Sequence, residues 1–424
     1  MTTEQAVERV MRHVTRDQLA DAVCGVVDIP SPTGGERPIA TWIVDNLIAH
    51  GVAAQLQTID EQQANAVGTI PGGDGPSTLL YAPLDTFTTG DPAYDVPSAA
   101  PVMRPDMLPR ASVHGDLVQG LGAGNPKGHA ACVLVALQAL AASGVELPGD
   151  VVGGFGAGGM PSFAINGVRQ NTGHGVGATF LLERGYTTDQ AVIAKPGWTV
   201  SHEEVGLVWL DVLVPGIHTY AGSRHRLPYR NAVSLAGEVA CYLESWLEQY
   251  ALRNELGTMR PQGIVSSITG GADRLAASTP ALVRLRLDLR ITTAQTPAGV
   301  TRELRTEVRR LGEKLGADLE VRQVAAVPAS HTPPDAPIVR ATVAAWEAVA
   351  GERHVPIMAN SGATDANILR MRGVPTARVG MPKVATTPAG DPVDFTAGMN
   401  LVDLREMRRL VEILVRTVLL VGRQ

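Results

Sequence analysis

The chain has 424 residues, of which 45% are hydrophobic and 18% charged, a composition typical of a globular protein of two or three domains. It excludes wholesale disorder, and the formal net charge of −6 argues against a nucleic-acid partner, which usually demands a basic face. No apolar run is long enough for a transmembrane helix, no secretory signal opens the chain, and the three cysteines lie far apart, so we expect a cytoplasmic protein without membrane contact.

The first 203 residues predict an α/β domain. Helical patterns flank a Pro/Gly-rich break at Ile29–Glu36, and the second helix ends at Gly51. We expect a helix over 128–143 and strands at Ala53–Ile59, Ser77–Ala82, Val151–Phe155 and Ala191–Ala194. Where strands alternate with helices, polar residues that follow the strands gather at one edge of the sheet, and sites form there.

Residues 204–324 follow the order β-α-β-β-α-β, which predicts a ferredoxin-like domain inserted into the first one. Its expected elements are strand Gly206–Val214, helix Val233–Asn254, strands Gln262–Thr269 and Leu282–Ile291, helix Pro297–Leu315 and strand Ala317–Gln323. The first domain then resumes over residues 325–424, with helices at 335–350 and 401–421. The Gly/Pro-rich piece Val379–Gly398 is expected to be a long loop, and such loops are often functional.

Residues Gly120–His129 (GLGAGNPKGH) form a Gly-rich turn that leads into an apolar helix. This turn resembles the GRGAxDMKGG signature of the dinuclear-zinc exopeptidases, the family of aminoacylase, acetylornithine deacetylase, succinyl-diaminopimelate desuccinylase and carboxypeptidase G. Further fragments similar to motifs of that family follow the same order: Ile29–Glu36, Gly216–His218 with Asn231–Ala232, Leu287–Arg290 and Ser361–Ala366. The resemblance covers nearly the whole chain. It implies an α/β, three-layer zinc-exopeptidase-like sheet domain split by a ferredoxin-like lid.

The same resemblance implies that this chain is a divergent member without the family's metal ligands. The bridging aspartate of the family falls on Asn125, whose uncharged amide is a poor bridging ligand. The remaining ligand positions and the general base fall on Pro83, Met160, Lys195, Phe395 and Gly159. Two divalent cations would repel an ammonium group between them, so we expect no zinc pair and no cofactor.

Other groups of the family's pocket are retained. His218 matches the histidine that reaches across a dimer interface and polarises the scissile carbonyl, which implies a homodimer formed through the lid. Arginine suits the substrate's terminal carboxylate because its rigid fork binds in a bidentate manner. The expected substrate-binding residues are Asn125, Lys127, Asn231, Arg290, Ser361, Gly362 and Thr364.

Three further residues are catalytic candidates beside His218, and each has a structural alternative. Lys195 supplies a charge that replaces the metal, forms a Schiff base, or only pairs with Asp85. Asp85 acts as a general base or only as the partner of that lysine. His129 is an acid/base group in the pocket or a plain helix-start residue, and Lys127 is expected chiefly to brace the turn.

These residues predict a metal-independent enzyme acting at a carbonyl or C–N bond of a small carboxylate-bearing amino acid derivative, amide or peptide. Hydrolysis, acyl transfer, cyclisation and elimination all stay open, and such chemistry suits a specialised pathway. One alternative is a pseudoenzyme that binds a ligand without turnover. Another is a zinc amidohydrolase with rearranged ligands, including a mononuclear site built from Asp85, His129 and one of His114, His174 or His202.

Overall fold

The computed structural model describes residues 1–165, 169 and 171–422, and these divide into two compact units. Unit 1 comprises Met1–His202, Thr332–Pro356 and Thr364–Gln424, and unit 2 comprises Glu203–His331 and Ile357–Ala363. The first boundary lies one residue from the expected 203/204. The second lies later than the expected 324/325, because strand β12 (Glu320–Val327) continues past that point in the sheet of unit 2.

Unit 1 is built on a six-stranded sheet in the order β1-β2-β6-β3-β7-β14. Its strands are β1 (Ala53–Thr58), β2 (Ala64–Ile70), β3 (Thr78–Pro83), β6 (Val151–Gly156), β7 (Gln190–Ala194) and β14 (Thr376–Val379). The last four are parallel to one another, whereas β2 runs antiparallel to both of its neighbours, β1 and β6. Strand β3 is buried along its whole length, as its uninterrupted apolar run predicts.

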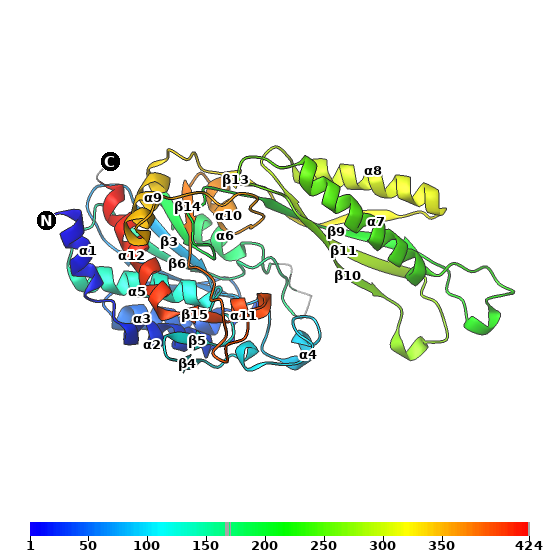
Figure 1. Cartoon of the computed structure of the whole chain (residues 1–424), viewed down its shortest axis with the longest axis horizontal. Coiled ribbons are helices and arrows are strands. Elements are labelled where there is room, and N and C mark those ends of the chain that lie inside the picture. The colour runs from blue at the N-terminus through cyan, green and yellow to red at the C-terminus, as the bar shows by residue number, and fades with distance from the viewer. Residues whose placement is uncertain (166–168, 170, 423–424) are drawn as a thin grey trace. The chain divides into compact units, whose positions relative to one another are not determined.

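Helices cover both faces of this sheet (Figure 1). Gly153 of β6 faces Leu137 of α5 (Lys127–Ser143), while the next residue, Gly154, faces Leu181 of α6 (Val176–Glu183). Successive residues of a strand point to opposite faces, so the two helices lie on opposite sides. The other helices of unit 1 are α1 (Thr3–Met11), α2 (Arg16–Val27), α3 (Arg37–Ala49), α4 (Pro92–Asp95), α9 (Pro337–Ala350), α10 (Ala366–Met371), α11 (Phe395–Met399) and α12 (Leu404–Val421).

The Gly-rich turn brings the start of α5 against another segment of backbone. A Cβ at position 124 would lie 2.4 Å from the carbonyl oxygen of Gly398 and 2.5 Å from that of Leu401. Only glycine tolerates such an approach. The segment from Leu401 also forms β15 (Leu401–Asp403), which joins β5 (Leu117–Gln119) and β4 (Ser112–His114) in a small sheet.

Unit 2 has the predicted ferredoxin-like arrangement. A four-stranded antiparallel sheet runs in the order β10-β11-β9-β12. Its elements follow the chain as β9 (Gly206–Pro215), α7 (Ala232–Arg253), β10 (Gly263–Gly270), β11 (Leu282–Ile291), α8 (Pro297–Leu315) and β12. A separate two-stranded pair joins β8 (Glu203–Glu204) to β13 (Ser330–His331). The α/β fold class is therefore confirmed.

Some elements differ from the sequence-based expectation. Helix α1 was not expected, and Thr2 and Gln5 close its first turn with reciprocal hydrogen bonds. Strand β2 was not predicted from the sequence, because its buried residues do not alternate with exposed polar ones. The supposed loop Val379–Gly398 contains the start of α11. Along the described part of the chain, every helix is too short or too polar to cross a bilayer.

Candidate active site

The candidate site lies at the carboxyl edge of the parallel strands in unit 1. Asp85 follows β3, Met160 follows β6 and Lys195 directly follows β7. His129 lies in the first turn of α5. All four side chains are at most 4% exposed. The sheet topology thus gathers at one edge three residues that the sequence singled out as catalytic candidates.

Asp85 is completely buried and surrounded by donors. Thr33 donates its hydroxyl to Oδ2 at 2.7 Å, and the Gly159 amide donates to Oδ1 at 2.7 Å. The Met160 amide lies 3.1 Å from both oxygens. Burial raises the pKa of Asp85, while the Thr33 hydrogen bond and the Lys195 charge oppose that shift. Because both oxygens already accept hydrogen bonds from the protein, the carboxylate holds the turn that carries Met160.

Lys195 brings its ammonium group into the same buried cluster. Its Nζ lies 3.5 Å from the thioether sulfur of Met160. The cationic charge is felt by both Asp85 and His129, since it lowers the pKa of each. The backbone of Lys195 is fixed as well, because its amide donates to Val379 at 3.1 Å and a Cβ at Gly380 would lie 1.9 Å from its carbonyl oxygen.

His129 and Asn125 carry polar atoms that the described residues leave unpartnered. Both ring nitrogens of His129 and Oδ1 of Asn125 are buried without a hydrogen-bond partner. Burial, followed by the charge of Lys195, lowers the pKa of His129 to about 3, although the nearby backbone of Gly124 opposes this shift. The imidazole is therefore neutral at pH 7 and offers one donor and one acceptor.

Lys127, an expected substrate-binding residue that the sequence also assigned to bracing the turn, contacts backbone carbonyls of the protein. Its side chain is fully buried, and Nζ donates to the carbonyl of Ile29 at 2.6 Å and to that of Val27 at 3.4 Å. Desolvation lowers the pKa of Lys127 to about 7. The ammonium braces the end of α2 against the Gly-rich turn, which is the structural role that the sequence favoured.

Glu36 is a part of this region that sequence reasoning missed. Its Oε1 accepts from the amides of Gly34 and Gly158 at 2.8 and 3.0 Å, while Oε2 is buried without a partner among the described residues. Burial, followed by the charge of Asp85, raises the pKa of Glu36 to about 8. The sequence feature that could have identified Glu36 is its position directly after Gly34-Gly35, because a turn there places it at the start of α3.

This shift predicts how stability depends on pH. Glu36 remains protonated in the folded protein between its ordinary pKa of 4.5 and about pH 8, whereas the unfolded chain has lost the proton. The unfolded state therefore binds fewer protons, and the free energy of unfolding falls as pH rises through that window. Glu36→Gln keeps the acceptor but stays neutral, so we expect it to be more stable than the parent by about 1–3 kcal/mol at pH 8 and similar near pH 5. Thermal unfolding from pH 5 to 8, with the exposed Glu61→Gln as control, measures this; parallel curves for parent and Glu36→Gln would contradict it.

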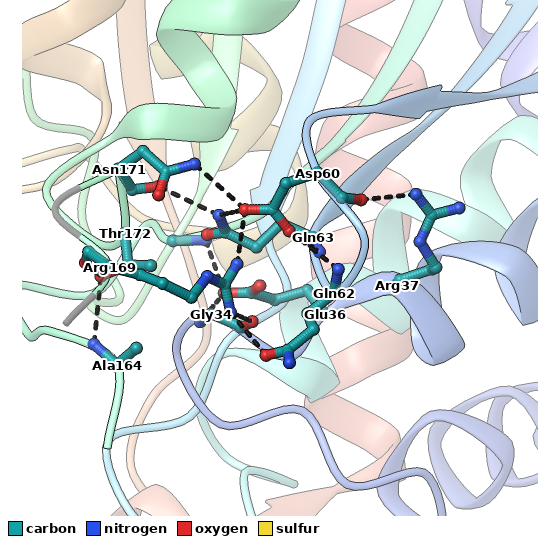
Figure 2. A network of polar contacts seen from close by, with 11 residues as sticks. Gly34, Glu36, Arg37, Asp60, Gln62, Gln63, Ala164, Arg169, Asn171 and Thr172 are labelled. Atoms are coloured by element: carbon teal, nitrogen blue, oxygen red, sulfur yellow. Dashed lines mark hydrogen bonds and ion pairs between the residues drawn. The ribbon is translucent and has the colours of Figure 1, made fainter. Parts of the chain in front are cut away.

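A second polar network fastens the segment after β6 beside Glu36, and Figure 2 shows it around Asp60. Burial raises the pKa of Asp60, but hydrogen bonds from Gln63 and Arg169 outweigh it and hold the pKa well below its ordinary value. Arg169 also donates to the Gly34 carbonyl at 2.6 Å, and Asn171 donates to Asp60 at 3.0 Å. The network ties the loop that carries Arg169 and Asn171 to the loop that precedes Glu36.

The remaining expected residues lie mostly in unit 2, where they form two groups. His218 is exposed and bonds through Nδ1 to the Thr279 carbonyl at 2.8 Å. The Ile217 amide donates to Arg230 at 2.9 Å, which brings the His218 loop beside Asn231, the cap of α7.

Arg290 and Ser361 line a small pocket of 170 Å³ in unit 2. There Arg290 Nη2 already pairs with Asp288 at 2.8 Å, and Ser361 accepts from the Gln262 amide at 3.1 Å. Gly362 follows in the same segment, whereas Thr364 is in unit 1, where its hydroxyl accepts from the Ala366 amide.

The donor set of the strand-end cluster does not fit a zinc pair. Zinc needs anionic or imidazole donors at about 2.0–2.3 Å, but the positions that the resemblance assigns to the ligands hold a proline, an amide, a thioether, an ammonium and, on α11, a phenyl ring. Gly159, the position that the resemblance assigns to the general base, has no room for a side chain, because a Cβ there would lie 2.3 Å from Pro83 Cβ and 2.5 Å from Asp365 Oδ2. Across the described residues no three His, Cys, Asp or Glu side chains gather as a metal site. The mononuclear site suggested for Asp85, His129 and a further histidine is therefore not formed among them either.

Comparison with known proteins identifies relatives of this architecture. Residues 96–419 match the sequence model of peptidase family M20/M25/M40. Human carnosine dipeptidase 1 has a similar fold, with a TM-score of 0.72 and 14% identity over 100% of this chain and 99% of that one. The metallo-carboxypeptidase Sso-CP2 of Sulfolobus solfataricus gives 0.69 and 13%, over 96% and 99% of the two chains. The YXEP protein of Bacillus subtilis, a dinuclear metal-binding peptidase, gives 0.60 and 15%, over 96% and 98%.

Proposed function

The chain belongs to peptidase family M20/M25/M40, and on that premise we propose that it acts on the amide bond of a small carboxylate-bearing amide or peptide without the paired metal ions. The observation that carries the proposal is the buried ammonium of Lys195, 3.5 Å from Met160 in the cluster that also holds Asp85. In the resemblance both positions belong to metal ligands. A fixed positive charge there stabilises negative charge that develops on a carbonyl oxygen.

The use of lysine in this chain supports the assignment. Of its 36 basic residues only four are lysines: Lys127, Lys195, Lys314 and Lys383. Two of these four, Lys127 and Lys195, are at most 4% exposed. Arginine supplies nearly all other cations, including the buried Arg370 and Arg378. Lysine differs from arginine because it carries a compact point charge, which suits a site that must also admit a substrate.

We assign the surrounding side chains as follows. Water adds to the carbonyl carbon, the C–N bond breaks, and the proton moves to the departing amine. Lys195 stabilises the carbonyl oxygen in that step, and neutral His129 supplies a hydrogen bond beside it. Asp85 is a positioning residue, because its oxygens are already occupied and its charge balances that of Lys195.

Two rival functions are separated by metal content and by turnover. We expect the purified protein to turn over members of a panel of N-acyl amino acids and dipeptides after exhaustive chelation, with far less than one metal ion per chain by mass spectrometry. Loss of turnover on chelation, restored by zinc, would establish the rearranged zinc enzyme instead. Binding of panel members without any turnover would establish the pseudoenzyme.

We further propose that the protein is a homodimer through unit 2. Strand β10 is an edge of its sheet and exposes Ile264 and Ile268, at 54% and 56%. An open apolar edge is a template for pairing with a second copy. Sedimentation should give twice the chain mass, and Ile264→Lys/Ile268→Lys should give a monomer; a monomeric parent would contradict the proposal.

A further inference from the structure

A pocket of 580 Å³ lies in unit 1 beside Asn125. Its walls come from the residues after β3 (86–88), from α4 and its following turn (94–99), from the Gly-rich turn (121–125) and from α11 (395–400). A volume of this size accommodates a small organic molecule.

The walls are aromatic in a chain that has few aromatic residues. Phe87, Tyr94 and Phe395 line the pocket and are 44%, 56% and 71% exposed. The chain has five phenylalanines, so two of the five stand at this one opening. Exposed aromatic groups gathered around a cavity mark a binding surface, because each favours burial against a partner.

Two hydroxyl groups of the walls are already used by the protein. The Thr86 hydroxyl donates to the Thr88 carbonyl at 2.7 Å, and that of Thr396 to the Ala99 carbonyl at 2.9 Å. Among the described residues of the lining, Asp95 is the one that carries a charge, and both of its oxygens accept from the Thr89 amide. The pocket therefore offers no cation to a carboxylate, and it favours an uncharged, flat group.

The aromatic wall on α11 is held in place before any ligand arrives. Arg104 forms two hydrogen bonds with Asp394, at 2.7 and 3.2 Å, and a further ion pair with Asp106. Asp394 caps α11 through the Ala397 amide at 2.7 Å, directly before Phe395. A wall fixed in this way loses little entropy when it binds a ligand.

Asn125 lines this pocket and lies four residues before His129 in the chain. The side chain lines the pocket, yet it is only 8% exposed, and Oδ1 is without a partner among the described residues. Its Nδ2 has only the weak contact with the sulfur of Met399, at 3.6 Å. The amide carries both an acceptor and a donor, so it can form a hydrogen bond with either the carbonyl or the N–H of a bound amide group.

We propose that this pocket is the subsite for an uncharged aromatic acyl group of the substrate, and that Asn125 contacts the adjoining amide. The inference rests on the proposed function. The substrate proposed there consists of an amine half, which carries the carboxylate, and an acyl half, joined by the amide bond. The lining has Asp95 and no cation, so the carboxylate half is disfavoured and the acyl half belongs here.

Isothermal titration with N-benzoylglycine and N-acetylglycine tests this subsite. We expect the benzoyl compound to bind about 10- to 100-fold more tightly than the acetyl compound. Phe395→Ala should weaken binding of the benzoyl compound about tenfold and that of the acetyl compound far less, because the acetyl group offers the ring little surface. Asn125→Leu should weaken both. Phe180→Ala, the same change on α6 outside the pocket, is the matched control and should alter neither.

Equal affinity for the two compounds, no binding of either, or a Phe395→Ala variant that keeps the full preference would overturn the subsite. The outcome is separable from the proposed function. Tight binding of the benzoyl compound that depends on Phe395, without turnover of any amide, would keep the subsite and end the enzyme proposal. Turnover of both compounds with equal KM would keep the enzyme proposal and end the subsite.

Discussion

Lys195→Met is expected to lower kcat by about 10²- to 10³-fold on whichever amide the panel identifies, because it removes a fixed charge from the reacting oxygen. Methionine is similar to lysine in length and lies beside another thioether, Met160, so no large cavity opens. Asp85 loses a neighbour that lowers its pKa, so its pKa rises further and the neutral form of the buried carboxyl group is favoured. The melting temperature should therefore change by only a few degrees while activity collapses.

The exposed Lys383 gives a matched control, since Lys383→Met makes the same chemical change away from the cluster. It should retain parental kcat. A Schiff-base role for Lys195 is distinguished by borohydride treatment during turnover. The imine forms with loss of water and borohydride reduces it, so the parent chain would gain the mass of the carbonyl compound less one oxygen atom, and Lys195→Met would not. Parental kcat in Lys195→Met would remove this residue from the chemistry altogether.

The sequence was sufficient for the architecture because its signals are local. The Gly-rich turn before α5 predicts close backbone approach, and Gly124 lies where any Cβ would strike two carbonyl oxygens. The order of elements in residues 204–324 predicts the ferredoxin-like sheet, which forms in the order β10-β11-β9-β12. Boundaries were less predictable: β12 extends to Val327 because its pairing with β9 continues to Leu207, which no local pattern in its own segment reveals.

The site was predictable only in part because hydrogen-bond partners depend on tertiary contacts. Strand ends placed Asp85 and Lys195 at one edge, as expected. The sequence does not show that Thr33 and the Gly159 amide would fill the oxygens of Asp85, nor that Lys127 would bind the carbonyl of Ile29. Glu36 was not predicted for the same reason, since its high pKa arises from burial and from the carboxylate of Asp85, which lies 49 positions away in the sequence.

Asp85 decides whether this buried cluster contains a general base or a brace, and its variants separate the two roles. Asp85→Ala leaves the amides of Gly159 and Met160 buried without an acceptor, and it leaves the Thr33 hydroxyl with the Ser162 hydroxyl as its remaining partner. Each such group costs about 1–3 kcal/mol, so we expect the free energy of unfolding to fall by about 3–5 kcal/mol. Asp85→Asn keeps one oxygen and should lose about 1–2 kcal/mol. Denaturant unfolding measures both, with the exposed Asp150→Ala as a control that should cost far less.

Activity in Asp85→Asn then separates the two roles. A brace needs an acceptor oxygen but no proton transfer, so kcat should stay within about tenfold of the parent, well above that of Lys195→Met. A general base cannot be replaced by an amide, because the amide does not take up a proton at neutral pH. Stability close to the parent combined with a loss of kcat equal to that of Lys195→Met would therefore return Asp85 to the chemistry. The occupied oxygens of Asp85 favour the first result, since a carboxylate that accepts from three protein donors has little capacity left for the proton of an attacking water.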